Sequence, residues 1–121
     1  MSTAAASDLT VGPLTQTDLV RYQGASGDFN ALHHDVTAAA EGRRVISPGM
    51  YQAGLMDTWL ARTTDGAHVR SFAVRFLAPA YVGDTLTITG GPVEAEPGVI
   101  EMECRNEAGS VLLTGRAVLA E

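Results

Sequence analysis

The spacing of apolar residues divides the chain into a helical part and a strand part. A run with almost no polar face predicts a mostly buried helix, and its residues are Met50, Tyr51, Ala53, Leu55, Met56, Trp59 and Leu60. The helix is expected to begin with Ser47 as the N-cap and Pro48 at the first helical position, because both residue types favour those places. It is expected to end in the Thr-Thr-Asp-Gly sequence of residues 63–66.

From residue 70 onward the hydrophobic period changes to two, which is typical of β-strands. Phe72, Val74 and Phe76 share one face of the first predicted strand. Turn sequences separate three more predicted strands, over residues 85–89, 100–105 and 111–119. Helices followed by about four long antiparallel strands indicate the α+β class, with the sheet wrapped around the buried helix.

The segment before the buried helix is predicted to hold shorter elements. Thr15 and Asp18 are typical of a helix start, where a hydroxyl caps free N–H groups and a carboxylate favours the first turn. Residues 24–30 consist largely of Gly, Ser, Asp and Asn, which indicates a structured loop. Asp35 is expected to cap a short helix over Val36 to Glu41.

Composition narrows the possible functions. The chain has 121 residues, 45% of them hydrophobic, which predicts one folded domain over residues 9–121 behind a frayed Ala/Ser-rich tail of residues 1–8. The tail lacks the features of a signal peptide, and no apolar run is long enough to span a bilayer, so a cytoplasmic protein without membrane association is expected. The net charge of −6 argues against nucleic-acid binding.

Two residue counts exclude particular chemistries. All eight basic residues other than histidine are arginines, so catalysis through a lysine amine, including Schiff-base formation, is excluded. Cys104 is the only cysteine; it cannot form a disulfide within the chain, and one thiol makes no metal cluster.

The loop around residues 24–35 carries the most informative chemistry. Asp28 and His33 lie five residues apart, and a carboxylate and an imidazole facing one cavity can hold one water molecule and divide proton transfer between them. Asn30 has the donors and acceptor to lock the loop. A purely structural interpretation, with Asp28 forming a turn and His33 packing beside a helix, stays open. A calcium loop is rejected because no further acidic ligands follow at the required spacing.

The start of the buried helix is a second candidate. A helix N-terminus presents unpaired N–H groups and partial positive charge, which suit a carbonyl oxygen that gains charge during a reaction. Gly49 permits the close approach of a substrate. An ordinary helix cap is the alternative interpretation of the same residues. No metal site is expected, because the adjacent His33 and His34 point apart.

The residues Ser26-Gly27-Asp28-Phe29-Asn30-Ala31-Leu32-His33 resemble the signature of the MaoC-like (R)-specific enoyl-CoA hydratases and related dehydratases. The Pro-Gly-Met opening of the buried helix and residues 76–84 fit the same family, so the resemblance covers nearly the whole chain after Leu9. It implies a hotdog fold, in which a curved antiparallel sheet wraps one long central helix.

The resemblance also implies a reaction and its residues. The family adds water reversibly to a trans-2-enoyl thioester to give the (R)-3-hydroxyacyl product, with no metal or redox cofactor and with coenzyme A or acyl carrier protein as the substrate carrier. Asp28 and His33 would form the catalytic pair, and the Gly49 amide would bind the thioester carbonyl. The other substrate-binding residues are expected to be Ser26 and Asn30, which would shape the loop, and Met50 and Tyr51, which would help set pocket depth.

The chain departs from the family pattern in three ways, of which the last, at the N-terminus, bears on partners. Ala31 replaces a common proline, Pro48 replaces a common histidine, and an opening strand is expected to be missing. A homodimer is expected, with a heteromer containing a second hotdog subunit as an alternative. Arg43 and Arg44 could meet coenzyme A phosphates or an acidic carrier protein; two solvated surface arginines are the other interpretation.

Two further functions compete with a hydro-lyase. A hotdog thioesterase would direct water to C1 of the thioester instead of C3. A non-catalytic protein would be the structural half of a heteromeric hydratase, or a module that only binds acyl thioesters. The acyl group and the physiological direction of the reaction are not predicted by the sequence.

Overall fold

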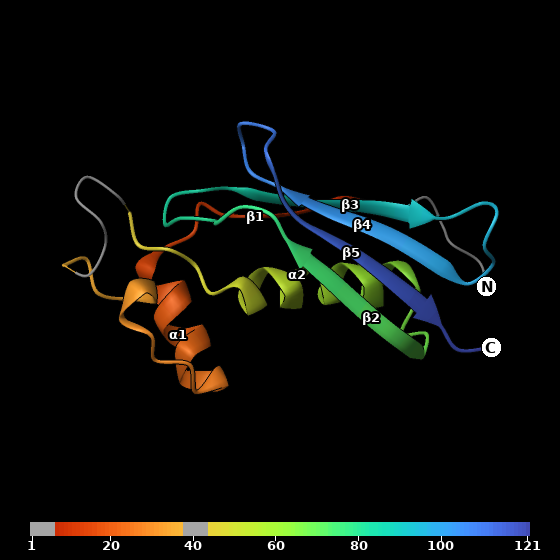
Figure 1. The fold of residues 1–121 in the computed structure, drawn as a ribbon, viewed down its shortest axis with the longest axis horizontal. Helices are drawn as coiled ribbons and strands as arrows, with labels where there is room; N and C mark the ends of the chain where they lie inside the picture. The colour runs from red at the N-terminus through yellow and green to blue at the C-terminus, as the bar shows by residue number, and fades with distance from the viewer. Residues whose placement is uncertain (1–6, 38–43) are drawn as a thin grey trace.

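The computed structural model describes residues 7–37 and 44–121. Its elements follow in this order: β1 (Leu9–Val11), α1 (Gln16–Ser26), a 3₁₀ turn η1 (Ala31–His33), α2 (Gly49–Thr63), β2 (Val69–Phe76), β3 (Leu86–Pro92), β4 (Val99–Arg105) and β5 (Val111–Leu119). The two α-helices precede the four long strands (Figure 1), which confirms the predicted α+β class.

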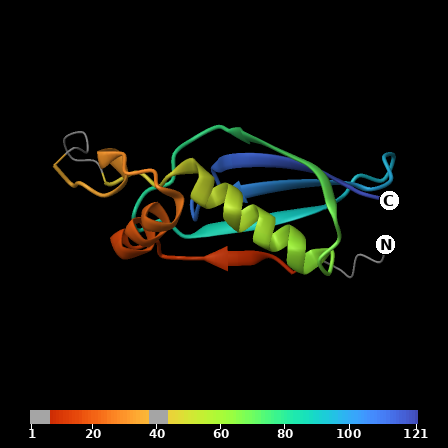
Figure 2. The ribbon, with the colours of Figure 1, turned by 90° about the horizontal axis from the view of Figure 1, so that it is seen from below.

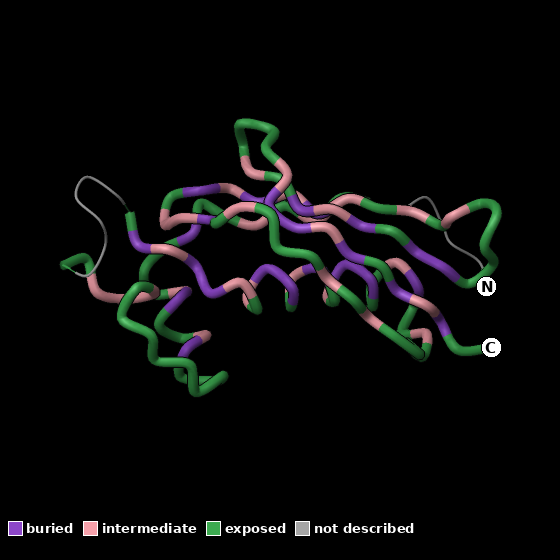
Figure 3. Tube along the Cα trace, viewed as in Figure 1, coloured by how far each residue is buried: buried purple, intermediate pink, exposed green. Residues whose placement is uncertain are grey.

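The five strands form one antiparallel sheet in the order β1-β3-β4-β5-β2. The sheet curves over α2, which crosses one of its faces (Figure 2). Figure 3 shows buried residues along α2 and the strands, and further ones on α1 and on the segment before α2. Helix α2 buries Ala53, Met56, Trp59 and Leu60. An apolar helix face against the inner face of a sheet gives the chain one continuous hydrophobic core.

The centre of that core depends on Trp59. Its side chain is 1% exposed, and its indole N–H donates to the carbonyl of Ser7 at 3.1 Å. A buried indole normally needs such an acceptor. The hydrogen bond ties Ser7, inside the segment expected to form a frayed tail, to the core. Neither α-helix of the described residues is long and apolar enough to cross a bilayer.

The predicted cap of α2 is wrong by one residue. Pro48 is the N-cap and makes no side-chain cap hydrogen bond, and Gly49 is the first helical residue. The backbone of Pro48 is extended, with φ −58° and ψ 131°. The Ser47 hydroxyl instead donates to Oε1 of Gln52 at 2.8 Å. Gln52 lies in the first turn of α2, so the Ser47 side chain binds another side chain there and does not cap the free backbone N–H groups.

The opening strand expected to be absent is present. β1 pairs with β3, with Leu9 opposite Ile88. Three residues are too few to produce a recognisable alternation of apolar and polar positions.

The helix predicted over Val36 to Glu41 does not start as expected. Val36 and Thr37 lie in a turn, where the Asp35 carboxylate accepts hydrogen bonds from the N–H and the hydroxyl of Thr37. Residues 38–41 lie outside the described residues.

Candidate active site

Helix α1 sets the position of the Asp28 loop. Thr15 and Asp18 form a capping box at its start, as the sequence predicts. At its end, Gly27 adopts φ 78°, and its N–H donates to the carbonyl of Gln23 at 2.8 Å. A left-handed residue after a helix is most easily a glycine. The chain therefore turns sharply at Gly27 and places Asp28 directly beyond the helix.

Three short-range hydrogen bonds shape the loop from within. The Ser26 hydroxyl accepts from the Asp28 N–H at 3.2 Å, and the Asp28 carboxylate accepts from the Asn30 N–H at 3.2 Å. The Asn30 side chain then accepts from the Leu32 N–H at 3.0 Å and so begins η1. Such side-chain contacts with backbone N–H groups hold turns in one conformation.

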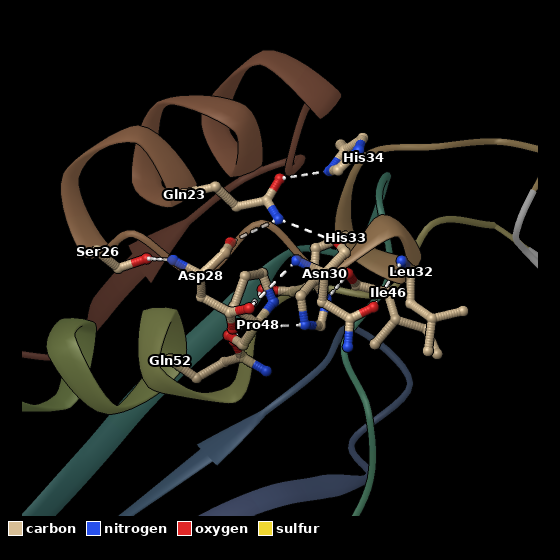
Figure 4. Close-up of polar contacts among 11 residues, drawn as sticks. Gln23, Ser26, Asp28, Asn30, Leu32, His33, His34, Ile46, Pro48 and Gln52 are labelled. Carbon is tan, nitrogen blue, oxygen red and sulfur yellow. Dashed lines mark hydrogen bonds and ion pairs between the residues drawn. The ribbon is translucent and has the colours of Figure 1, made fainter.

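Gln23 is a central residue of this loop that the sequence analysis missed. Its side chain is only 2% exposed, and its Nε2 donates to the carbonyls of Asp28 at 2.8 Å and Asn30 at 3.1 Å. Its Oε1 contacts Nδ1 of His34 at 3.1 Å. Figure 4 shows Gln23 reaching from α1 into the loop. The available signal was a polar residue four positions after Leu19, on the buried face of α1.

Asp28 and His33 face each other across a short gap (Figure 4). His33 Nδ1 lies 2.7 Å from the carbonyl of Ile46. A carbonyl can only accept, so Nδ1 carries the proton and the neutral ring leaves a lone pair on Nε2. That Nε2 lies 3.9 Å from Oδ2 of Asp28. The separation is too long for a direct hydrogen bond, but one water oxygen about 2.8 Å from each atom would contact both at roughly a right angle.

A cavity of about 410 Å³ opens beside His33. Most of its walls are apolar, and the lining residues are His33, Ile46, Ser47, Gly49, Met50, Gln52, Phe76, Ala78 and Pro79. Apolar walls with a few converging polar groups are typical of small-molecule sites. Such a cavity suits an apolar chain whose polar end lies near His33 and the start of α2.

Gly49 occupies the point where the helix start meets the cavity. A Cβ atom at this position would lie 2.7 Å from the Phe76 ring, so a larger residue would displace that ring. As the first residue of α2, Gly49 has an N–H with no acceptor inside the helix. His33, Gly49 and Met50 all line this cavity, and Asp28 lies next to His33, although these residues come from two separate segments of the chain.

The comparison with protein families identifies the domain. The model for the MaoC-like domain matches residues 5–110. The chain belongs to the MaoC-like domain family. A search of curated protein sequences found no match.

Solved structures agree with this family. The unliganded R-hydratase PhaJ1 from Pseudomonas aeruginosa is 25% identical, with a TM-score of 0.82 over 93% of this chain and 77% of that one. The (R)-hydratase from A. caviae involved in PHA biosynthesis is 22% identical, with a TM-score of 0.77 over 98% and 96%. The ChsH1-ChsH2 complex from Mycobacterium tuberculosis gives 25% identity and a TM-score of 0.80 over 99% and 97%. The predicted family and hotdog fold are confirmed, and the predicted hydro-lyase class agrees with these hydratases.

Tyr51 lies apart from the cavity of this MaoC-like domain. It was predicted to help set pocket depth, and it is not among the residues that line the 410 Å³ cavity. Its ring packs edge-on against Tyr22, with centroids 5.4 Å apart and planes at 86°. Burial raises the pKa of its phenol, and the charge of Asp18 adds to the effect. Tyr51 therefore joins α1 to α2, whereas Met50, 58% exposed, lines the cavity.

The Arg44 guanidinium binds residues of the segment before β3. Its Nη1 lies 3.0 Å from the Asp84 carboxylate and donates to the carbonyl of Val82 at 3.0 Å. The guanidinium also lies over the Tyr81 ring, 5.3 Å from the centroid. These contacts hold it on the segment before β3, so a phosphate would compete with Asp84 for the same cation. Arg43 lies outside the described residues.

A larger hollow, of about 680 Å³, lies on strands β2 to β5. Its charged residues are Arg75, Glu101, Glu103 and Arg116, and Arg116 pairs with Glu101 at 3.6 Å. No histidine and no helix start is among its lining residues, so the smaller cavity is the better candidate for proton transfer. The described residues contain no group of three or more His, Cys, Asp or Glu side chains placed to hold a metal.

Proposed function

We propose that this MaoC-like domain catalyses the reversible hydration of a trans-2-enoyl thioester to the (R)-3-hydroxyacyl thioester. The observation that carries the proposal is the pair of Asp28 and His33, whose facing atoms are 3.9 Å apart. His33 lines an apolar cavity together with Gly49, the first residue of α2. A bound water there would have a base on one side and an imidazole lone pair on the other. The hydratase neighbours support the same reaction.

The proposed reaction starts at the thioester carbonyl. The Gly49 N–H and the positive end of α2 stabilise the charge that develops on the carbonyl oxygen, which makes C3 electrophilic. Asp28 takes a proton from the held water, and the water oxygen bonds to C3. The lone pair on His33 Nε2 accepts a hydrogen bond from the same water and so positions it. The proton that Asp28 has taken then passes to C2 on the same face, which leaves Asp28 ionised again.

Water addition leaves the substrate at the same overall oxidation level, so the proposed chemistry uses no redox cofactor. The thioester carrier, coenzyme A or acyl carrier protein, provides the handle by which the acyl group reaches the cavity. The apolar side chains of Ile46, Met50 and Phe76 would then surround the acyl chain.

We also propose that the site works beside a second hotdog subunit, in a homodimer or a heteromer. Strand β2 is an edge of the sheet, with β5 as its one neighbour in the described residues. An open edge offers unpaired backbone groups to another strand. Large apolar residues near the site are exposed as well, including Phe29 at 67% and Phe76 at 53%. Light scattering should give the mass of a dimer; a monomer active on its own would contradict this proposal.

The test of the reaction follows enoyl absorbance and free thiol together in purified protein given a short trans-2-enoyl-CoA. Loss of absorbance without thiol release is expected, followed by chiral analysis for the (R) product. Release of thiol would instead indicate the thioesterase alternative. The protein's own Cys104 is buried, so it should contribute little to the thiol signal. If neither signal changes, the proposed reaction fails for this chain alone, and an added hotdog partner that restores turnover would identify it as half of a heteromer.

A further inference from the structure

Gln52 is a buried polar residue that the catalytic pair does not account for. It lies on the first turn of α2, is 3% exposed and lines the 410 Å³ cavity beside His33. A carboxamide costs free energy to bury unless its donors and acceptor find partners. Its Oε1 accepts from the Ser47 hydroxyl at 2.8 Å. No hydrogen bond among the described residues uses its Nε2, so that NH₂ group is available on the cavity side.

Ser47 holds the carboxamide of Gln52 in one orientation. The Ser47 N–H donates to the carbonyl of Ala80 at 2.8 Å, which fixes the serine backbone. Its hydroxyl has two acceptors, Gln52 Oε1 at 2.8 Å and the more distant Pro48 carbonyl at 3.3 Å. Because the hydroxyl donates to Oε1, the oxygen of the carboxamide faces Ser47 and its NH₂ group faces the other way.

The carboxamide lies at the same end of the helix as the free N–H of Gly49. Side chains on a helix lean toward its N-terminus, so a residue at the fourth position covers the first turn. Ser47 precedes the helix, so its hydrogen bond to Gln52 shows that the Gln52 carboxamide reaches back to the N-terminal end of α2. Figure 4 shows the Gln52 side chain extending from α2 toward Pro48 and the loop that carries Asp28. Gly49 and Gln52 both line the cavity.

We infer that Gln52 donates a second hydrogen bond to the thioester carbonyl oxygen, beside that of the Gly49 N–H. This inference rests on the proposed function and adds a catalytic residue to it. Two convergent donors stabilise an oxyanion better than one, and a donor held in place before the reaction needs no rearrangement when charge develops. Ser47 acts as a positioning residue, because it fixes which end of the carboxamide faces the substrate.

The test replaces Gln52 with methionine, which has a similar length and shape but no donor. Removal of one oxyanion donor lowers kcat by about 100- to 1000-fold in other enzymes, and we expect a loss in this range for Gln52→Met with KM changed little. The melting temperature should fall only slightly, because the Ser47 hydroxyl loses its acceptor at 2.8 Å but keeps the Pro48 carbonyl at 3.3 Å. Ser47→Ala should lower kcat by a smaller factor, and Ser47→Thr should restore most of it.

A second measurement reads the carbonyl directly. An aryl-substituted enoyl-CoA absorbs at longer wavelength when its carbonyl is polarised, and Asp28→Asn protein can bind it without turnover. We expect a shift to longer wavelength that shrinks in Asp28→Asn/Gln52→Met. Thr58→Val is the matched control, because the Thr58 hydroxyl donates to the Gly54 carbonyl of its own helix and does not line the cavity; kcat and the shift should both be unchanged.

The outcomes separate this inference from the proposed reaction. If wild-type protein hydrates the substrate and Gln52→Met keeps its kcat and the full shift, Gln52 is not a donor to the carbonyl. If wild-type protein hydrates nothing but polarises the probe through Gln52, the proposed reaction fails and the inference stands. Absence of a shift in every variant would overturn the inference, whatever the reaction.

Discussion

A substitution of Asp28 is expected to change the activity of the protein much more than its stability. We expect Asp28→Asn to lower kcat by about 100- to 10,000-fold, because the amide cannot accept a proton from water and general bases contribute on this scale. The side chain is about half exposed, and the asparagine oxygen can still accept from the Asn30 N–H. The melting temperature should therefore change little. Turnover of the enoyl thioester and thermal unfolding are the two measurements.

Asp65→Asn is the matched control for this substitution. Asp65 lies in the turn after α2 with φ 53°, a conformation that asparagine also tolerates. Its replacement changes the charge by the same amount, so kcat should stay at the wild-type value. Equal losses in both variants would attribute the effect to net charge and remove the assigned role of Asp28.

At the residue scale, the sequence predicted the loop more completely than the cavity. Asp28, Asn30 and His33 are close in the chain, so their spacing already limits how they can be arranged. Gln23 and Gln52 were missed because a glutamine in an amphipathic helix has the same pattern whether it faces solvent or a buried loop. The packing of Tyr51 on Tyr22 was missed for the same reason, since its neighbours on α2 do not specify which element covers it.

At the element scale, the start of α1 supports the Asp28 loop at its other end. Thr15→Ala removes the hydroxyl that accepts from the Asp18 N–H at 3.1 Å. Loss of an N-cap typically costs about 1 kcal/mol, and we expect a decrease of that size in the free energy of unfolding by urea. Thr17→Ala, at an exposed position inside the same helix, should be neutral or slightly stabilising. Equal effects of the two substitutions would contradict the capping role.

The same cap predicts a dependence on pH. The hydrogen bond from the Thr15 N–H lowers the pKa of Asp18 in the folded protein. Its carboxylate therefore stabilises the fold above the unfolded pKa of about 3.9, and this contribution disappears as the pH falls through the lower folded pKa. Asp18→Asn should lower stability at pH 7 but have less effect near pH 3, as measured by urea unfolding. A constant difference across this range would contradict the assignment.

The position at which α2 begins depends on tertiary contacts as well as on local sequence. Serine followed by proline predicts a cap at Ser47, and local preference alone supports it. The hydroxyl instead finds Gln52, which the helix itself brings within 2.8 Å. The helix begins one residue later than predicted, with Pro48 as its N-cap. The Gln52 side chain, which lines the cavity, competes with the backbone N–H groups for the Ser47 hydroxyl.

At the scale of the whole molecule, the packing of α2 on the sheet depends on Gly90. A Cβ there would lie 2.5 Å from the Glu101 carbonyl oxygen and 2.9 Å from the Trp59 ring. We expect Gly90→Ala to destabilise the fold by about 1–3 kcal/mol, as overpacking does. Gly91→Ala is the control, because a Cβ at Gly91 meets nothing within 4 Å. Calorimetry or urea unfolding of the two variants should differ clearly; similar stability would contradict the contact.

Cys104 is buried in the same core, so the ionisation and reactivity of its thiol test whether the core is folded. Burial raises the pKa of its thiol to about 11, against about 8.5 in an unfolded chain. Folding therefore favours the neutral thiol, and this contribution to stability is lost as the pH rises between these values. Cys104→Ala should lose less stability than wild type from pH 8 to 11. The native thiol should also react with Ellman's reagent far more slowly than the unfolded one; rapid native reaction would contradict its burial.

The sequence by itself determined the α+β class, the buried helix and the Asp28–His33 loop, because these depend on periodicity and on residues close in the chain. The match to a family motif added the hotdog fold. Tertiary structure alone decided the pairing of β1 with β3, the packing of Tyr51 on Tyr22, and the meeting of Ser47, Gln52 and Gly49 beside His33. Those features depend on contacts between distant segments, whose geometry is set only when the sheet closes over α2 and the Asp28 loop docks against its N-terminus.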